Sequence, residues 1–302
     1  MKTKLVMILA AGLSLLFVHV LSAQDLGPQI KKIKDGIYVY VGKEFNSNAG
    51  IVLTQDGVVL IDSGHNPTDS RAILDAVKKL TSLPVRFLID TEPHGDHTTG
   101  HFVFSPPAVI IAHEGATDSM KKAYSPARNE KLMAGSPEMR AAFDGFRMIT
   151  PHMEYRQKMT LNLGERTFEL MYLKGVHSEA DTAVWLPKER VLFSASAVVV
   201  NQYNILRPFV TIPDILAAAK MMKALNPEFV VPGHGDPGTA KILDDMERYY
   251  NLLMERVGAM VKDGKSLDDI KKELKMPETD DWAGKDRFPN NIEAAYRAVK
   301  GS

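Results

Sequence analysis

The chain has 302 residues, of which 45% are hydrophobic and 25% are charged, and this composition is typical of a globular protein rather than a disordered one. Its 37 lysines and arginines balance its 37 aspartates and glutamates, so no basic surface for nucleic acid is indicated. The sequence contains no cysteine, which excludes disulfides, thiolate metal sites and cysteine nucleophiles. Any metal would therefore have nitrogen and oxygen ligands.

The first 23 residues have the pattern of a secretory signal peptide. Two early lysines precede an apolar run at residues 5–20, and the small residues Ser22 and Ala23 follow it. A membrane anchor is the alternative, but the run is shorter than the roughly 20 apolar residues that a span needs. We expect cleavage after Ala23, a periplasmic or secreted location and no stable membrane anchor.

After this segment, short strands and tight turns alternate. The first half of the chain predicts strands at residues 36–41, 49–53, 57–62 and 85–90 and a helix at residues 68–80. Asp56-Gly57 is a hairpin signal between the second and third strands. The strand at residues 85–90 leads directly into a loop that is rich in histidine.

The second half repeats this alternation of strands and helices. Strands are predicted at residues 168–173, 182–186, 191–193 and 229–231, and helices at residues 212–225, after Pro237 and at 291–299. The pattern favours an α/β fold with a sheet sandwich flanked by helices. We expect one catalytic domain at residues 24–263 and a helical extension at 264–302. The methionine-rich insertion at 114–155 fits either a packed helical pair or an apolar lid.

Four histidines lie in loops that directly follow predicted strands. His94 and His97 belong to Glu92-Pro-His-Gly-Asp-His97, while His177 and His234 lie in two later loops. Strand ends are rigid positions from which side chains can reach a cleft. Imidazole and carboxylate ligands suit zinc best, with iron or manganese as alternatives. Two such ions about 3.5–4 Å apart can share a water nucleophile, so we expect two metals per chain.

The loop at residues 92–97 resembles the His-x-His-x-Asp-His signature of the metallo-β-lactamase superfamily. Companion segments resemble that family's other motifs in the same order, at residues 58–64, 173–181, 191–196 and 231–234. The resemblance covers about residues 33–253. It implies an αββα sandwich and a zinc-dependent hydrolase.

The same resemblance implies a role for individual residues. The first metal would take Glu92, His94 and His177, and the second would take Asp96, His97 and His234. Asp96 would also orient the reacting water and carry its proton, as the catalytic residue. Five further residues would support a ligand or contact the substrate: Asp62, His65, Ser196, Tyr203 and Arg207. For Asp62, a turn-forming role after its strand is the alternative.

Two residues depart from the family pattern. Glu92 replaces the first histidine of the signature, and this change predicts an altered metal affinity or preference at the first site. Ser196 stands where many members have a bridging aspartate. Serine there resembles the lactamase branch with an Asp-His-His second site, and it disfavours the glyoxalase II, lactonase and phosphodiesterase branches.

The function predicted from these features is hydrolysis of a small molecule, in which a metal-bound hydroxide attacks a carboxyl-derived carbon. A β-lactam amide is the first expectation, while lactones, thioesters and other esters stay open, as does the oligomeric state. Two alternatives are a periplasmic metal-binding accessory protein that has lost catalysis and a di-iron oxidoreductase. The last would need the bridging aspartate and a redox partner domain.

Overall fold

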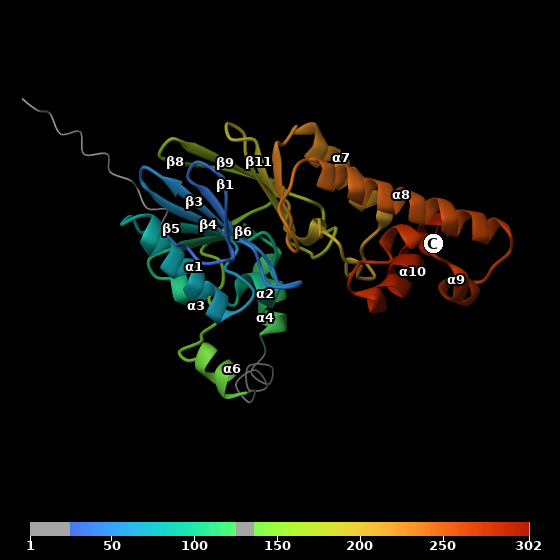
Figure 1. Ribbon diagram of the computed structural model, residues 1–302, viewed down its shortest axis with the longest axis horizontal. Helices are drawn as coiled ribbons and strands as arrows, with labels where there is room; N and C mark the ends of the chain where they lie inside the picture. The colour runs from blue at the N-terminus through green and yellow to red at the C-terminus, as the bar shows by residue number, and fades with distance from the viewer. Residues whose placement is uncertain (1–24, 125–135, 302) are drawn as a thin grey trace, which may run out of the picture.

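Two β-sheets stack face to face, and helices cover the outer face of each sheet (Figure 1). The structure is a computed structural model that describes residues 25–124 and 136–301. The predicted signal peptide at residues 1–23 lies outside the described residues.

The first sheet contains seven strands in chain order. They are β1 (Ile30–Lys34), β2 (Ile37–Tyr40), β3 (Ala49–Thr54), β4 (Gly57–Ile61), β5 (Val85–Ile89), β6 (Val109–His113) and β7 (Met153–Tyr155). Strands β1 to β4 pair antiparallel, and the predicted turn joins β3 to β4 with Thr54 opposite Gly57. Strands β4 to β7 are parallel. The carboxyl ends of β4, β5 and β6 therefore lie at the same edge of the sheet.

The second sheet contains five strands in the order β12-β11-β10-β9-β8. They are β8 (Lys158–Leu163), β9 (Arg166–Tyr172), β10 (Thr182–Leu186), β11 (Val191–Phe193) and β12 (Phe229–Val231). Only β11 and β12 pair in parallel, so their carboxyl ends also share one edge. The loops that follow these strands can therefore meet the loops that follow β4 and β5.

The core lies between the two sheets and continues beneath the helices. Alternate residues of each strand face the opposite sheet, which is why Val59 and Ile89 pack against Phe168 and Val184. All five residues of β4 are buried, because its other face lies under a helix. The fold is thus an αββα sandwich, and the predicted fold class is confirmed.

Helices cover the first sheet on one side and the second sheet on the other. The structure has α1 (Pro67–Leu80), α2 (Gly95–Thr98), α3 (His101–Phe104), α4 (Ala116–Ala123), α6 (Pro137–Ala142), α7 (Ile212–Ala224), α8 (Lys241–Lys262), α9 (Leu267–Glu273) and α10 (Phe288–Lys300), with 3₁₀ turns η1 (Ala195–Ala197), η2 (Pro277–Thr279) and η3 (Lys285–Arg287). Helix α1 packs Ile73 and Val77 on the first sheet, whereas α7 and α8 pack on the second. Helix α1 begins where Asn66 accepts two backbone N–H groups.

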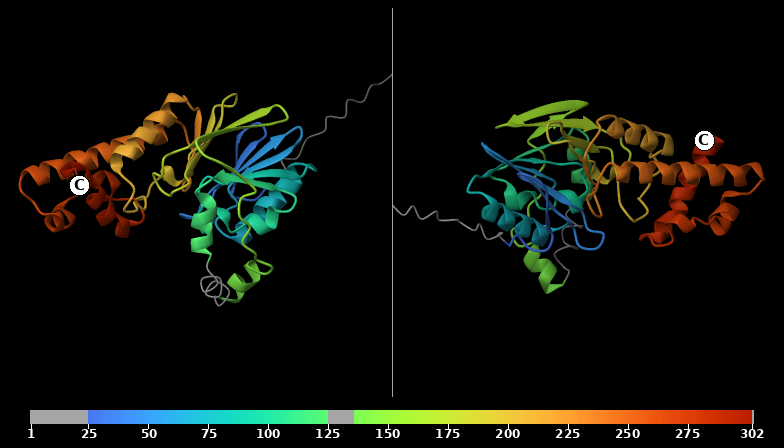
Figure 2. Two further views of the ribbon diagram at one scale, coloured as in Figure 1. Left: turned by 180° about the vertical axis from the view of Figure 1, so that it is seen from behind. Right: turned by 45° about the horizontal axis from the view of Figure 1, so that its top comes forward.

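The C-terminal helices project from one side of the sandwich (Figures 1 and 2). Helix α10 packs against α8, and its Ile292 and Ala295 share one apolar cluster with Leu253 and Val257 of α8. This cluster also contains Trp185 of the second sheet, so the C-terminal helices continue the core. The proposed boundary at residue 263 stays a prediction.

The described elements agree with the sequence prediction over most of the chain, although β1, β6, β7 and β8 were not predicted. Strand β8 alternates exposed polar residues with the half-buried Met159, Leu161 and Leu163 at the edge of its sheet, a strand pattern that the prediction missed. In the insertion, Met120 is buried in α4 whereas Met139 of α6 is exposed. Among the helices of the described chain, none combines the length and apolar character that a membrane span requires.

Candidate metal centre

Loops from both sheets meet at one end of the sandwich. The segment at residues 92–97 follows β5, and His177 lies between β9 and β10. Ser196 follows β11 and His234 follows β12. Residues that are far apart in sequence therefore come together at strand ends, where the sheets hold them rigidly.

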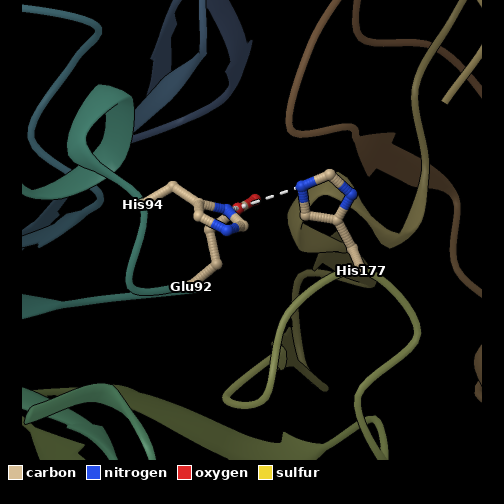
Figure 3. Close-up of side chains that lie close together, drawn as sticks. All are labelled: Glu92, His94 and His177. Atoms are coloured by element: carbon tan, nitrogen blue, oxygen red, sulfur yellow. Dashed lines mark hydrogen bonds and ion pairs between the residues drawn. The ribbon is translucent and has the colours of Figure 1, made fainter. Parts of the chain in front are cut away.

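The first group of candidate ligands contains Glu92, His94 and His177. One donor atom from each lies within 4.8 Å of the others. Glu92 Oε2 contacts His94 Nδ1 and lies 3.4 Å from His177 Nε2. Figure 3 shows Glu92 and His94 coming from one loop and His177 reaching them from the opposite side.

The second group contains Asp96, His97 and His234, whose donor atoms also lie within 4.8 Å of one another. Asp96 Oδ2 is 3.7 Å from His97 Nε2 and 3.5 Å from His234 Nε2. The two groups adjoin, because Glu92 Oε1 is 3.3 Å from His97 Nε2. Glu92 thus directs one oxygen toward each group.

Three of the histidines are held by a hydrogen bond at the ring nitrogen that faces away from the cluster. His97 Nδ1 lies 2.9 Å from Asp62 Oδ2, and His177 Nδ1 lies 3.0 Å from Asn204 Oδ1. His234 Nδ1 lies 2.8 Å from the carbonyl oxygen of Phe45. Each bond favours a proton on Nδ1 and leaves the Nε2 lone pair directed at the cluster, as in metal-binding histidines.

The electrostatics of the cluster favour a positive charge at its centre. Burial acts to raise the pKa of Glu92, but His97 and His177 outweigh it and hold that pKa well below its usual range. Burial acts to lower the pKa of His97, yet Glu92 and Asp62 raise it well above the ordinary value. Burial and the neighbouring Glu92 act to raise the pKa of Asp96, but His97, His234 and His65 outweigh them, so this pKa is also lowered.

These residues fit a metal ion. The carboxylate of Glu92 is only 1% exposed, and no lysine or arginine within the described ranges forms an ion pair with it. A buried carboxylate normally needs a fixed cation. Divalent ions would supply this charge, held by Glu92, His94 and His177 at one position and by Asp96, His97 and His234 at the other.

Comparison with known proteins decides the family. A family model described as the metallo-beta-lactamase superfamily matches residues 42–234, which include all six candidate ligands. The chain belongs to the metallo-beta-lactamase superfamily. The resemblance predicted from the sequence is therefore confirmed at the level of the superfamily, while the Asp-His-His branch stays a prediction.

Individual relatives of this superfamily member are distant. The chain is 23% identical to metallo-beta-lactamase type 2 from Bacteroides fragilis over 239 residues, or 75% of this chain and 86% of that one. Among solved structures, a metallo-beta-lactamase from Pontibacter korlensis has a TM-score of 0.58 at 20% identity, covering 72% of this chain and 96% of that one. The inverting sec-alkylsulfatase Pisa1 from Pseudomonas sp. has a TM-score of 0.70 at 18% identity, covering 90% of this chain. The present chain spans half the length of that alkylsulfatase.

The structure brings most of the predicted supporting residues to the centre. Asp62 accepts hydrogen bonds from the backbone N–H and the hydroxyl of Thr91 and holds His97, so it acts as more than a turn residue. The backbone N–H of Ser196 donates to Glu92 Oε1 at 3.0 Å. His65 lines the cleft beside the cluster, with its Nδ1 4.0 Å from Asp96 Oδ2.

Arg207 and Tyr203 take different places. Arg207 lines the cleft and donates from Nη1 to the carbonyl oxygen of His177 at 2.6 Å. Tyr203 does not line it, and its expected substrate contact is wrong for this structure. Its ring packs against the aromatic rings of Tyr249 and Trp282, and its hydroxyl bonds to Thr279, because its loop turns inward toward the C-terminal helices.

Two residues of the site were not found from the sequence. Phe45 supplies the carbonyl oxygen that holds His234, and a backbone acceptor leaves no side-chain pattern to recognise. Arg287 lines the cleft from the C-terminal segment, far along the chain from every motif. The packing of α10 against α8 and a backbone bridge between Ala283 and Gln202 bring it there.

Proposed function

We propose that this superfamily member is an exported hydrolase that cleaves an amide or ester bond of a small molecule. It would use two divalent cations, and zinc is the ion that best suits its imidazole and carboxylate ligands. The observation that carries the proposal is the pair of adjoining donor groups, each with two imidazoles and one carboxylate, at the wall of a cleft of about 600 Å³. When bound, the cations would polarise the scissile bond and acidify a water molecule.

The residues of the chain would position the reactants. Asp96 lines the cleft and is the half-exposed carboxylate of the cluster, so its free oxygen can accept a proton from water and pass it to the leaving group. Asp62, Asn204 and the carbonyl oxygen of Phe45 keep three imidazoles in one tautomer. The cluster would therefore be organised before the substrate enters.

The substrate is not fixed by the family. The relatives include proteins named for β-lactams and for alkyl sulfates, and one fold supports many reactions. A β-lactam is our first candidate within the amide class, because of the predicted export signal and the serine at position 196. We expect the hydrolase to have no nucleic-acid partner and, after signal cleavage, no stable membrane anchor.

The decisive experiment measures metal content and turnover together. Zinc-loaded protein should bind about two ions per chain and hydrolyse at least one member of a panel of β-lactams, lactones, thioesters, phosphoesters and alkyl sulfates. Turnover should stop with a chelator and return with zinc. His234→Ala should lose metal and activity, whereas His152→Ala, at an exposed histidine outside the cleft, should keep both.

The alternative outcomes are distinct. One ion or none per chain, without turnover of any substrate, would contradict the hydrolase and favour the metal-binding accessory protein. Export is tested separately, because cleavage after Ala23 predicts a mature protein that begins at Gln24 in the periplasm or medium. A protein that keeps Met1 and remains in the cytoplasm would contradict that part of the proposal.

A further inference from the structure

The cleft contains two arginines that have no carboxylate partner. Arg207 and Arg287 both line it, and neither forms a salt bridge with any acidic residue in the part of the chain that the structure describes. Arg207 donates to the carbonyl oxygen of His177, and Arg287 donates to the carbonyl oxygen of Tyr203 at 3.2 Å. Neutral partners orient both guanidinium groups without neutralising their charge.

Both arginines have guanidinium nitrogens that form no hydrogen bond with the described residues. The hydrogen bonds of Arg207 and Arg287 to other described residues all use Nη1. With respect to residues 25–124 and 136–301, each guanidinium therefore has Nη2 and Nε available for the paired hydrogen bonds that carboxylate, sulfate or phosphate oxygens accept. Two such groups in one cleft are a recognition site for an anion.

Gln202 adds a further donor in the same wall. It is 3% exposed and lines the cleft, and its side-chain oxygen accepts a hydrogen bond from Arg287 Nη1 at 3.2 Å. Its amide nitrogen is buried and has no hydrogen-bond partner among the described residues. Buried donors without partners are rare in folded proteins, and because Gln202 lines both this cleft and a neighbouring cavity, a ligand or water in either would complete its hydrogen bonds.

The same cleft also exposes apolar side chains. Six large hydrophobic residues of the described chain are exposed, and three of these, Phe45, Met139 and Ile205, line the cleft. Exposed apolar side chains that gather around one cleft mark a binding surface. The three residues come from separate parts of the chain, so their meeting is a property of the fold.

We propose that the substrate is an amphiphilic anion, whose charged group binds Arg207 and Arg287 and whose apolar part lies on Phe45, Met139 and Ile205. This inference rests on the proposed function, because it describes the substrate of the same centre. It also gives the C-terminal segment a role in specificity, since Arg287 comes from that segment. Arg207 Nη1 lies 3.4 Å from His177 Nε2, so the charged group would bind at the edge of the metal centre.

The test uses a matched pair of probes, 4-phenylbutanoate and its neutral amide. Isothermal titration of the zinc-loaded full chain should show at least about tenfold tighter binding of the anion. Repeating the titration after chelation separates arginine contacts from contacts to the metal. Arg287→Gln and Arg207→Gln should each weaken anion binding about tenfold and leave amide binding unchanged.

Two further variants control for folding and for charge. Arg287→Lys keeps the charge and should recover much of the anion preference, and circular dichroism should show normal unfolding for every variant. Arg156→Gln removes an arginine that is 80% exposed and does not line the cleft, so it should bind both probes as the wild type does.

The inference would be overturned if the two probes bind with equal affinity or if neither probe binds. It would also be overturned if both glutamine variants bind the anion as tightly as the wild type does. Selective anion binding without turnover of any substrate would instead support the anion site and contradict the hydrolase. The two proposals therefore fail in different measurements.

Discussion

Glu92→Gln is the change that tests the centre most directly. The substitution keeps the size of the side chain and removes one negative charge from a position that is 1% exposed. Glu92 directs Oε2 toward His177 and Oε1 toward His97, which belong to different ligand groups. We therefore expect the binding of both ions to weaken, and not only that of the first.

The size of the effect follows from the distances. A cation held about as far from Glu92 Oε2 as the 3.4 Å that separates this oxygen from His177 Nε2 would interact with the carboxylate by about 5 kcal/mol at an effective dielectric constant of 20. Glutamine keeps a carbonyl oxygen as a weaker ligand, so we expect roughly half of this energy to be lost. A loss of about 2.5 kcal/mol corresponds to about 70-fold weaker binding.

The assay is a zinc titration against a chromophoric chelator, which resolves the first and second equivalents. Glu114→Gln is the matched control, because Glu114 is a surface glutamate paired with Arg156. Weakening of one equivalent alone would mean that Glu92 serves a single ion. Unchanged affinity for both would refute the reasoning, since Glu92 would then not be a ligand.

Two further substitutions test the residues behind the ligands. Asp62→Ala removes the acceptor that orients His97. We expect this variant to stay folded and to bind zinc about 10–100-fold more weakly. Unchanged affinity in the same zinc titration would contradict this prediction. His101→Ala breaks a buried pair in which His101 Nε2 lies 2.8 Å from Asp90 Oδ1, and leaves Asp90 buried and unpaired. We expect about 3–5 kcal/mol lower stability in urea unfolding, and a loss below 1 kcal/mol would show that Asp90 has another partner.

The sequence was most informative where candidate ligand residues directly follow a predicted strand. Strand β5 runs directly into residues 92–97, so an apolar run followed by ligand residues was enough to predict the centre of the site. His177 and His234 could be added because each follows a strand of the second sheet. The six residues grouped from motifs are the same two groups that the structure brings together.

The parts that could not be predicted depend on tertiary packing. Tyr203 lies beyond Ser196 in sequence, but its ring turns into the aromatic cluster of α8 and the C-terminal segment rather than into the cleft. Arg287 shows the reverse, because nothing in its neighbourhood in the sequence points to a site. Both outcomes follow from long-range contacts, namely the packing of α10 on α8 and the backbone pairing of Ala283 with residues 201–203, which no local pattern specifies.

The two departures from the family pattern, Glu92 and Ser196, explain each other in the structure. The Ser196 N–H binds Glu92 Oε1, and the serine side chain is fully buried where the loop after β11 meets the loop after β12. A Cβ at Gly233 would come within 2.4 Å of Ser196 Oγ, so the close approach of these two loops requires glycine at position 233. An aspartate there would also place a third carboxylate beside Glu92 and Asp96. Glu92 Oε1 lies 3.3 Å from His97 Nε2 and Glu92 Oε2 lies 3.4 Å from His177 Nε2, so this one carboxylate would supply negative charge to both positions if metals are bound.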